Sequence, residues 1–238
     1  MIQAILFDFN GVIIDDEPVQ MSAYRDVLRE QGIELCESDY YGALGMDDKT
    51  FVRAQFERAG QTLTDDILKI VLDAKGVRHR KLIEDELPLF PGVVTFLKAN
   101  AREFSLGLVS MASAAEIQYV LERARLLSFF SVIVTAEDVN VCKPAPDCYL
   151  TALKRLNEIR AGEGGQPLRA DECLVIEDSP PGIESGRQAG MRSLGITNTV
   201  SAEQLRAAGA EVVSASLADW TVDAVRHVFE ERGKRGKG

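Results

Sequence analysis

The chain has 238 residues and a mass of 26.1 kDa, enough for one large α/β domain or for a core domain with a smaller insert. Hydrophobic residues make up 46% and charged residues 27% of the chain, which excludes wholesale disorder, collagen-like repeats and coiled coils. With 27 basic and 37 acidic residues the formal net charge is −10, which repels phosphate backbones and anionic lipids, so we expect neither nucleic acid nor membrane as a partner.

The first predicted strand covers residues 2–7, an apolar run that stops at Asp8 and leads into a loop with Gly11. From residue 18 to residue 86 apolar residues recur at spacings of three and four, which indicates amphipathic helices. Beyond residue 92 predicted strands and helices alternate. The strands are expected at 106–109, 132–135, 174–176, 192–195 and 211–213, and the helices at 93–101, 114–125, 147–156, 182–189, 202–208 and 217–230.

This order predicts an α/β protein with a doubly wound, mostly parallel, Rossmann-like sheet that binds ligands at the carboxyl ends of its strands. The core domain is expected to comprise residues 1–14 and 89–238, with an all-helical domain of residues 15–88 inserted into it. The four cysteines contain no CxxC pair, which predicts a reducing compartment and no zinc site. Because no secretory signal or bilayer-length apolar stretch is found, we expect a cytoplasmic protein.

Four short segments that carry polar or charged side chains each follow a predicted strand. They are Asp8-Phe9-Asn10-Gly11-Val12, then Ser110, then Lys143-Pro144-Ala145-Pro146-Asp147, and last Glu177-Asp178-Ser179 with Gly182. Taken singly, each has an ordinary structural explanation, such as a turn or a helix cap. Their shared position at strand ends favours a common active site.

Phosphoryl transfer needs these side chains, because an anionic nucleophile must reach an anionic phosphate while other groups neutralise the charge. Asp8 can act as the nucleophile and form an aspartyl phosphate. Asp8, Asp178 and Glu177 offer the oxygen ligands that Mg²⁺ prefers. Lys143 and Ser110 can bind the phosphate.

In these four motifs the chain resembles the haloacid dehalogenase superfamily, in the branch with β-phosphoglucomutase and phosphoglycolate phosphatase. The resemblance covers nearly the whole chain. It implies Asp8 as the nucleophile, Ser110 and Lys143 on phosphate, and Glu177 and Asp178 at magnesium. It also implies that the insert at 15–88 is a helical cap that closes over the site.

One departure from the family lies at Asn10, where phosphatases and mutases of the family carry a second aspartate that protonates the leaving oxygen and then activates water. An amide cannot transfer that proton, although the Asn10 backbone carbonyl can still bind magnesium. The help that general acid/base catalysis gives, about 10²–10⁴-fold, is therefore lost or supplied from elsewhere. Asp15, Asp16 and Glu17 are the nearest carboxylates that can replace it.

A second departure lies in the insert, where mutases of this branch have an arginine for a distal phosphate and a histidine in the first helix. Here the loop reads Gly45-Met46-Asp47-Asp48-Lys49 and the helix position holds Gln20. Aspartates repel a second phosphate, so a hydrolase is favoured over a mutase.

Two further patterns, a basic run in the insert and the two histidines, bear on function. The basic run at 75–81 can attract anions, but a solvated helix face is the favoured interpretation. The two histidines, His79 and His227, stand far from every motif in the sequence, which argues against histidine chemistry.

The function predicted from these residues is a Mg²⁺-dependent phosphohydrolase of a small phosphorylated metabolite, of sugar phosphate or phosphoglycolate type, through an aspartyl phosphate on Asp8. The alternatives are a phosphonatase with a Schiff base on Lys49, a mutase, a metal-independent dehalogenase, and a weakly active phosphometabolite-binding protein because of Asn10. The substrate and the oligomeric state stay open.

Overall fold

The structure is a computed structural model, which describes residues 1–235 and the side chains of residues 1–229. The strands within this range are β1 (Ala4–Phe7), β2 (Ser105–Val109), β3 (Val132–Val134), β4 (Cys173–Glu177), β5 (Arg192–Ile196) and β6 (Val212–Ser214). The helices are α1 (Glu17–Glu30), α2 (Glu37–Tyr41), α3 (Asp48–Arg58), α4 (Asp65–Leu82), α5 (Val93–Asn100), α6 (Ala114–Ala124), α7 (Asp147–Gly162), α8 (Pro180–Gln188), α9 (Ala202–Ala207) and α10 (Val222–Arg235).

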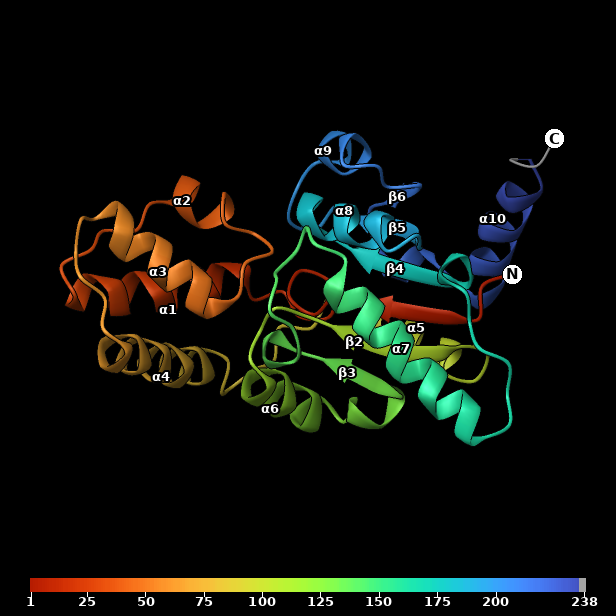
Figure 1. Ribbon diagram of the computed structural model, residues 1–238, viewed down its shortest axis with the longest axis horizontal. Helices are drawn as coiled ribbons and strands as arrows, with labels where there is room; N and C mark the ends of the chain where they lie inside the picture. Colours follow the sequence, from red (N-terminus) through yellow and green to blue (C-terminus); the bar gives the residue numbers. More distant parts are fainter. Residues whose placement is uncertain (236–238) are drawn as a thin grey trace.

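The six strands of the described region form one parallel sheet in the order β3-β2-β1-β4-β5-β6 (Figure 1). From β1 the chain winds to β2 and β3 on one side and returns to build β4, β5 and β6 on the other. The predicted fold class, an α/β protein with a doubly wound parallel sheet, is thereby confirmed. The strand order reverses between β1 and β4, and ligands bind such sheets at the carboxyl ends flanking this point.

Each face of the sheet is covered by helices, which explains why β1 is apolar at every position. Ile5 and Phe7 pack in a core with residues of α5, α6 and α10, whereas Ala4 and Leu6 pack in a second core with residues of α7. All four residues are fully buried. Burial of a side chain of the size of Leu6 or Phe7 contributes about 1.5–3 kcal/mol, so the sheet is held firmly from both sides.

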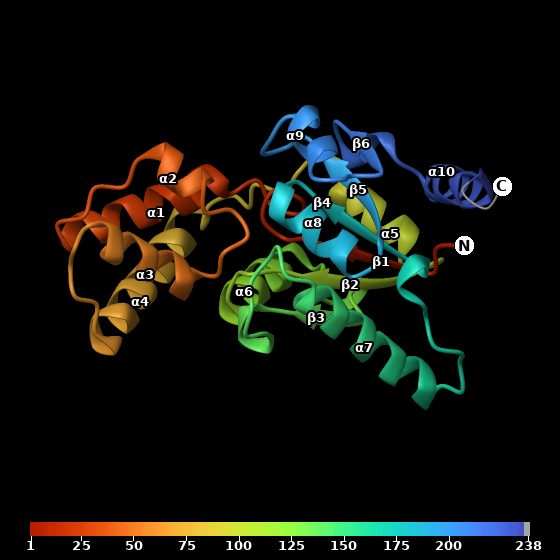
Figure 2. The ribbon, with the colours of Figure 1, turned by 45° about the horizontal axis from the view of Figure 1, so that its top comes forward.

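Helices α1 to α4, residues 17–82, form a separate group that we call the helical lobe. The strand arrowheads point toward this lobe, which therefore lies over the carboxyl edge of the sheet (Figures 1 and 2). The lobe has its own apolar core, to which α1 contributes Tyr24, α3 contributes Phe51 and Phe56, and α4 contributes Val71. Two chain segments connect the lobe to the sheet domain, and they run side by side because Ile14 and Leu89 form an antiparallel bridge.

The predicted elements differ from the observed ones mainly at helix ends. Helix α7 continues to Gly162 instead of ending at 156, and the helix predicted from 217 begins only at Val222. Residues Leu217–Asp219 form a separate 3-10 turn, capped by the Ser216 hydroxyl, and the extended backbone of Trp220 separates this turn from α10. Across residues 1–235, every helix is too short or too polar to serve as a membrane span.

Candidate active site

The acidic residues of the first and fourth motifs meet at the ends of β1 and β4. Phe7 pairs with Ile176 in the sheet, and the Asp8 amide donates a hydrogen bond to the Ile176 carbonyl at 2.9 Å. This register brings Asp8 next to Glu177 and Asp178, and one carboxylate oxygen of each lies within 4.8 Å of the others. Three carboxylates from segments about 170 residues apart thus face one point, as parallel pairing requires.

Lys143 of the third motif lies among these acids with its side chain only 2% exposed. Its ammonium donates to Asp8 Oδ1 at 2.8 Å, to Glu177 Oε1 at 2.7 Å and to the Val109 carbonyl at 3.2 Å. An ammonium has three N–H donors, so this set uses all of them. Lys143 therefore fixes the position of Asp8 and leaves the other oxygen of Asp8, Oδ2, without a contact to the lysine.

Glu177 is fully buried, and both of its oxygens are occupied by donors. Oε1 accepts from Lys143 and from the Tyr149 hydroxyl at 2.9 Å. Oε2 accepts from the backbone amides of Asp178 and Ser179 and from the Ser179 hydroxyl at 3.0 Å. Glu177 thus lies behind Asp8 and orients Lys143, whereas Asp178 reaches the pocket. Tyr149 carried no signal in the sequence, because it lies inside a predicted helix.

Ser110 of the second motif is 1% exposed and lines the same pocket as Asp8. Its Oγ accepts a hydrogen bond from the Ala112 amide at 3.0 Å. The N-cap of α6 is instead Ser113, whose hydroxyl accepts from the Glu116 amide. The hydroxyl proton of Ser110 is therefore available to a ligand in the pocket.

Burial and mutual repulsion disfavour the charged forms of the pocket acids. Burial, with the charge of Glu177, raises the pKa of Asp8 to about 7, although Lys143 opposes the shift. Burial, with Glu177 and Asp8, also raises the pKa of Asp178 well above its usual range. A cation bound between these carboxylates would favour their ionised forms.

Gly11 shows why the first motif needs a glycine after Asn10. Its φ is +74°, and an added Cβ would lie 1.8 Å from Oδ2 of Asp178. The Gly11 carbonyl accepts from the Asn198 side chain at 2.7 Å, and Thr199 hydrogen-bonds Asp178. Sequence reasoning missed Asn198 and Thr199, because the loop after β5 carries no charged residue that marks it.

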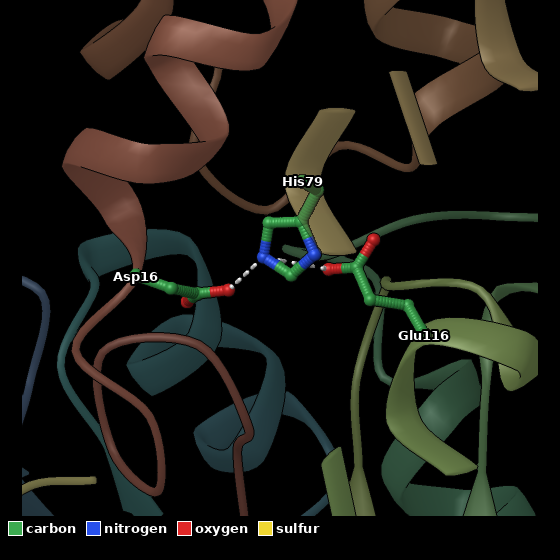
Figure 3. A group of neighbouring side chains, drawn as sticks. All are labelled: Asp16, His79 and Glu116. Carbon is green, nitrogen blue, oxygen red and sulfur yellow. Dashed lines mark hydrogen bonds and ion pairs between the residues drawn. The ribbon is translucent and has the colours of Figure 1, made fainter. Parts of the chain in front are cut away.

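Asn10 connects the pocket to a polar cluster between the sheet and the helical lobe. Figure 3 shows three members of this cluster, Asp16, His79 and Glu116. The Asn10 amide donates to Asp16 Oδ1 at 2.9 Å, and Gln20 donates to Asp16 Oδ2 at 3.1 Å. His79 Nε2 lies 2.8 Å from the same Oδ2 and 3.9 Å from Oε1 of Glu116. The cluster links the first motif, α4 and α6, and within it Asp16 and His79 are fully buried, whereas Asn10, Gln20 and Glu116 also line the pocket.

The basic run at 75–81 is therefore only partly a solvated face, and that expectation is wrong for two of its members. Lys75 is 2% exposed, with Nζ 2.9 Å from Glu116 and 3.3 Å from Asp48. His79, one helical turn later on α4, is also buried, whereas Arg78 pairs with a glutamate of α1 on the outside. The spacing of four residues puts both buried side chains on one face of α4, a signal that the sequence contained.

The pocket is formed by both parts of the chain, has a volume of about 100 Å³ and is open to solvent on one side. Of the predicted site residues, Glu177 alone does not line it. Asp47, expected in the loop at the substrate, instead caps α3 by accepting from the Thr50 amide, and Asp48 lines the pocket. The core side contributes Asp8, Asn10, Ser110, Lys143 and Asp178, and the lobe contributes the polar side chains Glu17, Gln20, Tyr24, Tyr40 and Asp48.

A family model of haloacid dehalogenase-like hydrolases matches residues 2–190. The putative phosphatase YhcW of Bacillus subtilis is 32% identical over 205 residues, which are 84% of this chain and 86% of that protein. The phosphorylated carbohydrates phosphatase of Thermotoga maritima is 27% identical over 199 residues, 81% of this chain and 83% of that protein.

Two other proteins resemble the chain, one over a small part of its own length and one over nearly all of it. Protein SUPPRESSOR OF QUENCHING 1 of Arabidopsis thaliana is 26% identical over 232 residues, but the chain spans only 20% of its length. The crystal structure of β-phosphoglucomutase from Clostridium difficile aligns with a TM-score of 0.84 at 23% identity, covering 98% of this chain and 99% of that one. The latter similarity shows a shared fold. With a family model that covers most of its length and a relative above 30% identity, the chain belongs to the haloacid dehalogenase-like hydrolases, as its four motifs predicted.

Proposed function

We propose that this hydrolase is a Mg²⁺-dependent phosphatase of a small phosphorylated carbohydrate or similar metabolite, acting through an aspartyl phosphate on Asp8. The observation that carries the proposal is the position of Asp8, in a pocket with a second carboxylate, Asp178, and one oxygen held by Lys143. Phosphatases among the relatives support it, and one of them is named for phosphorylated carbohydrates. A cytoplasmic location is proposed with it, since all four cysteines are free thiols.

The donor set fits a magnesium ion. Asp8 and Asp178 offer carboxylate oxygens in the pocket, and Asn10 offers its backbone carbonyl. The three carboxyls of Asp8, Asp178 and Glu177 lie near one ammonium group, that of Lys143. When the carboxyls are ionised, this leaves an excess of negative charge that a divalent cation balances. In our proposal Glu177 orients Lys143, because both of its oxygens already accept hydrogen bonds. Bound Mg²⁺ supplies Lewis acidity toward phosphate oxygens.

The proposed reaction has two displacements at phosphorus. In the first, Asp8 Oδ2 forms a bond to phosphorus while the ester P–O bond breaks, and the leaving oxygen takes up a proton. In the second, the oxygen of a water molecule bonds to phosphorus, and the bond to Asp8 breaks to release phosphate. Throughout, Lys143 holds Asp8 in place, and the Ser110 hydroxyl donates to a phosphate oxygen.

The insert of residues 15–88, which contains the helical lobe, is proposed to act as a cap that selects the part of the substrate beyond the phosphate. Its wall of the pocket contains Glu17 and Asp48, and each of these carboxyls accepts a hydrogen bond from a tyrosine hydroxyl of the lobe, Glu17 from Tyr40 and Asp48 from Tyr24. Such groups suit the hydroxyls of a sugar or polyol, whereas carboxylates repel a second phosphate. A monophosphate hydrolase is therefore favoured over a mutase that must bind a bisphosphate.

The phosphonatase alternative finds less support. Lys49 is exposed on α3 and lines an outer cavity rather than the pocket with Asp8. A Schiff base on Lys49 would form away from the proposed nucleophile. Borohydride reduction in the presence of an aldehyde phosphonate tests this alternative, and covalent trapping on Lys49 would establish it.

The proposal is tested by a screen of sugar phosphates, polyol phosphates, phosphoglycolate and phosphonates, with Mg²⁺ and with a chelator. We expect phosphate release from a monophosphate that requires the metal and disappears in Asp8→Ala. Full activity of Asp8→Ala would exclude the aspartyl phosphate. Tight binding of a phosphate ester by the wild type without turnover would instead identify a binding protein.

A further inference from the structure

The proposed phosphatase reaction needs a proton donor for the leaving oxygen, and Asn10 cannot serve as one. Three carboxylates follow the first motif, at Asp15, Asp16 and Glu17. The structure gives them different surroundings, and those surroundings decide which of them can exchange a proton with a substrate. The inference rests on the proposed phosphatase function.

Asp15 and Asp16 are both unsuited to this role. Asp15 is exposed and does not line the pocket, and its backbone amide is tied to the Pro88 carbonyl in the connection to the lobe. Asp16 is fully buried and also does not line the pocket. Its Oδ2 lies 2.8 Å from His79 (Figure 3) and accepts from Gln20, while its Oδ1 accepts from Asn10. Both oxygens of Asp16 are therefore occupied within the cluster.

Glu17 lies in the pocket with Asp8 and Asn10. It is the first residue of α1, so its backbone is fixed by the helix, and the Tyr40 hydroxyl of α2 donates to Oε2 at 2.5 Å. Within the described residues no hydrogen bond is made to Oε1. One oxygen of this carboxyl is thus held by the lobe while the other can meet a ligand.

The surroundings of the Glu17 carboxyl determine its pKa. Burial, together with the charges of Asp16 and Asp8, raises its pKa to about 7, while the Tyr40 hydrogen bond and the charge of Lys75 oppose the shift. Glu17 in turn adds to the raised pKa of Asp178, after burial and the charges of Glu177 and Asp8, and to that of Tyr41, after burial. Near neutral pH the carboxyl is therefore present in both forms, which an acid that later acts as a base requires.

We infer that Glu17 is the general acid and base of this enzyme, acting from the cap where Asn10 leaves the usual position without a proton. As the ester P–O bond breaks and the bond from Asp8 to phosphorus forms, the Glu17 carboxyl gives its proton to the leaving oxygen. The resulting carboxylate then takes a proton from the water that attacks phosphorus, as the bond to Asp8 breaks. Both proton transfers balance, and Glu17 ends the cycle protonated.

Glu17→Gln tests the inference, because the amide keeps an acceptor for Tyr40 but cannot donate an acidic proton. Turnover of the alkyl monophosphate found in the screen should fall by about 10²–10⁴-fold. Turnover of p-nitrophenyl phosphate should fall far less, because its leaving group departs without a proton. Glu37→Gln, an exposed glutamate of α2, is the matched control and should leave both rates unchanged.

The outcomes separate this inference from the proposed function. If the wild type hydrolyses both substrates through Asp8 but Glu17→Gln slows them equally, or slows neither, Glu17 is not the acid. A selective loss with alkyl phosphate in Asp15→Asn, with none in Glu17→Gln, would assign the role to Asp15. If the wild type has no phosphatase activity that depends on Asp8, the proposed function itself fails.

Discussion

Lys75 offers a sharp test of how the helical lobe is held against the sheet. Its ammonium, 2% exposed, lies between Glu116 of α6 at 2.9 Å and Asp48 of α3 at 3.3 Å. In Lys75→Met the similar volume is kept, but two acids lose their cation, and the Glu116 side chain is only 6% exposed. Removal of one partner from a buried pair costs about 3–5 kcal/mol, so we expect a loss of that size in the free energy of unfolding.

The loss has a defined pH dependence. Although burial opposes it, the neighbouring acids raise the pKa of Lys75 above its ordinary range. The contribution of Lys75 to the free energy of unfolding is therefore complete below its pKa in the unfolded chain, about 10.4, and is lost only as the pH rises through its pKa in the folded protein. Lys75 lowers the pKa of Glu116, whose contribution is present above the unfolded pKa of about 4.3 and is lost as the pH falls through the folded one. The effect of Lys75→Met should therefore be constant near neutral pH and shrink in acid.

Urea unfolding followed by circular dichroism measures this loss, with Lys154→Met as control. Lys154 forms an exposed pair with Glu158 on α7, and such pairs contribute about 0–1 kcal/mol. Lys75→Met/Glu116→Gln should be more stable than Lys75→Met, because it removes the buried unpaired charge. A loss below about 1 kcal/mol in Lys75→Met would refute the buried bridge.

Three further predictions concern the pocket. Gly11→Ala should lose metal-supported turnover, because the added Cβ meets the Asp178 carboxylate. The control Gly60→Ala also lies at positive φ but in open space, so it should lose only about 1–2 kcal/mol of stability. Equal activity in both variants would refute the close approach. Lys143→Met should shift the acid limb of the pH–rate profile upward, because the lysine lowers the pKa of Asp8, and an unmoved limb would contradict their contact. Asn10→Asp should raise alkyl phosphate turnover more in Glu17→Gln than in the wild type, and equal gains would mean that the two positions act separately.

The sequence predicted the sheet and the motif residues because each is encoded locally. A short apolar run such as Ala4–Phe7 marks a strand, and Asp8 marks its end. Parallel pairing then brings strand ends together whatever their separation in the chain, so Asp8, Lys143 and Asp178 could be assigned to one site beforehand. The ends of helices were predicted less accurately, because the end of α7 at Gly162 and the start of α10 at Val222 are set by local caps and turns.

The contacts between the lobe and the sheet could not be predicted, because they depend on how two separately packed parts meet. Lys75 and His79 looked like members of a charged, solvated run, and only the position of Glu116 on α6 explains their burial. Similarly, nothing local distinguishes Asp16 from Glu17. Their difference arises because Asn10 and His79 bind Asp16, whereas Glu17 turns into the pocket.

The central claim, that Asp8 carries the phosphoryl group during turnover, is tested most directly by trapping the intermediate. The protein would be mixed with its substrate and Mg²⁺, quenched in acid within the first turnovers, digested, and examined by mass spectrometry. The account predicts one phosphoryl group on the peptide that contains Asp8, its removal by hydroxylamine, and its absence in Asp8→Ala. Phosphate release at the full rate with no phosphorylated Asp8 peptide, or with the group on another residue, would contradict the account.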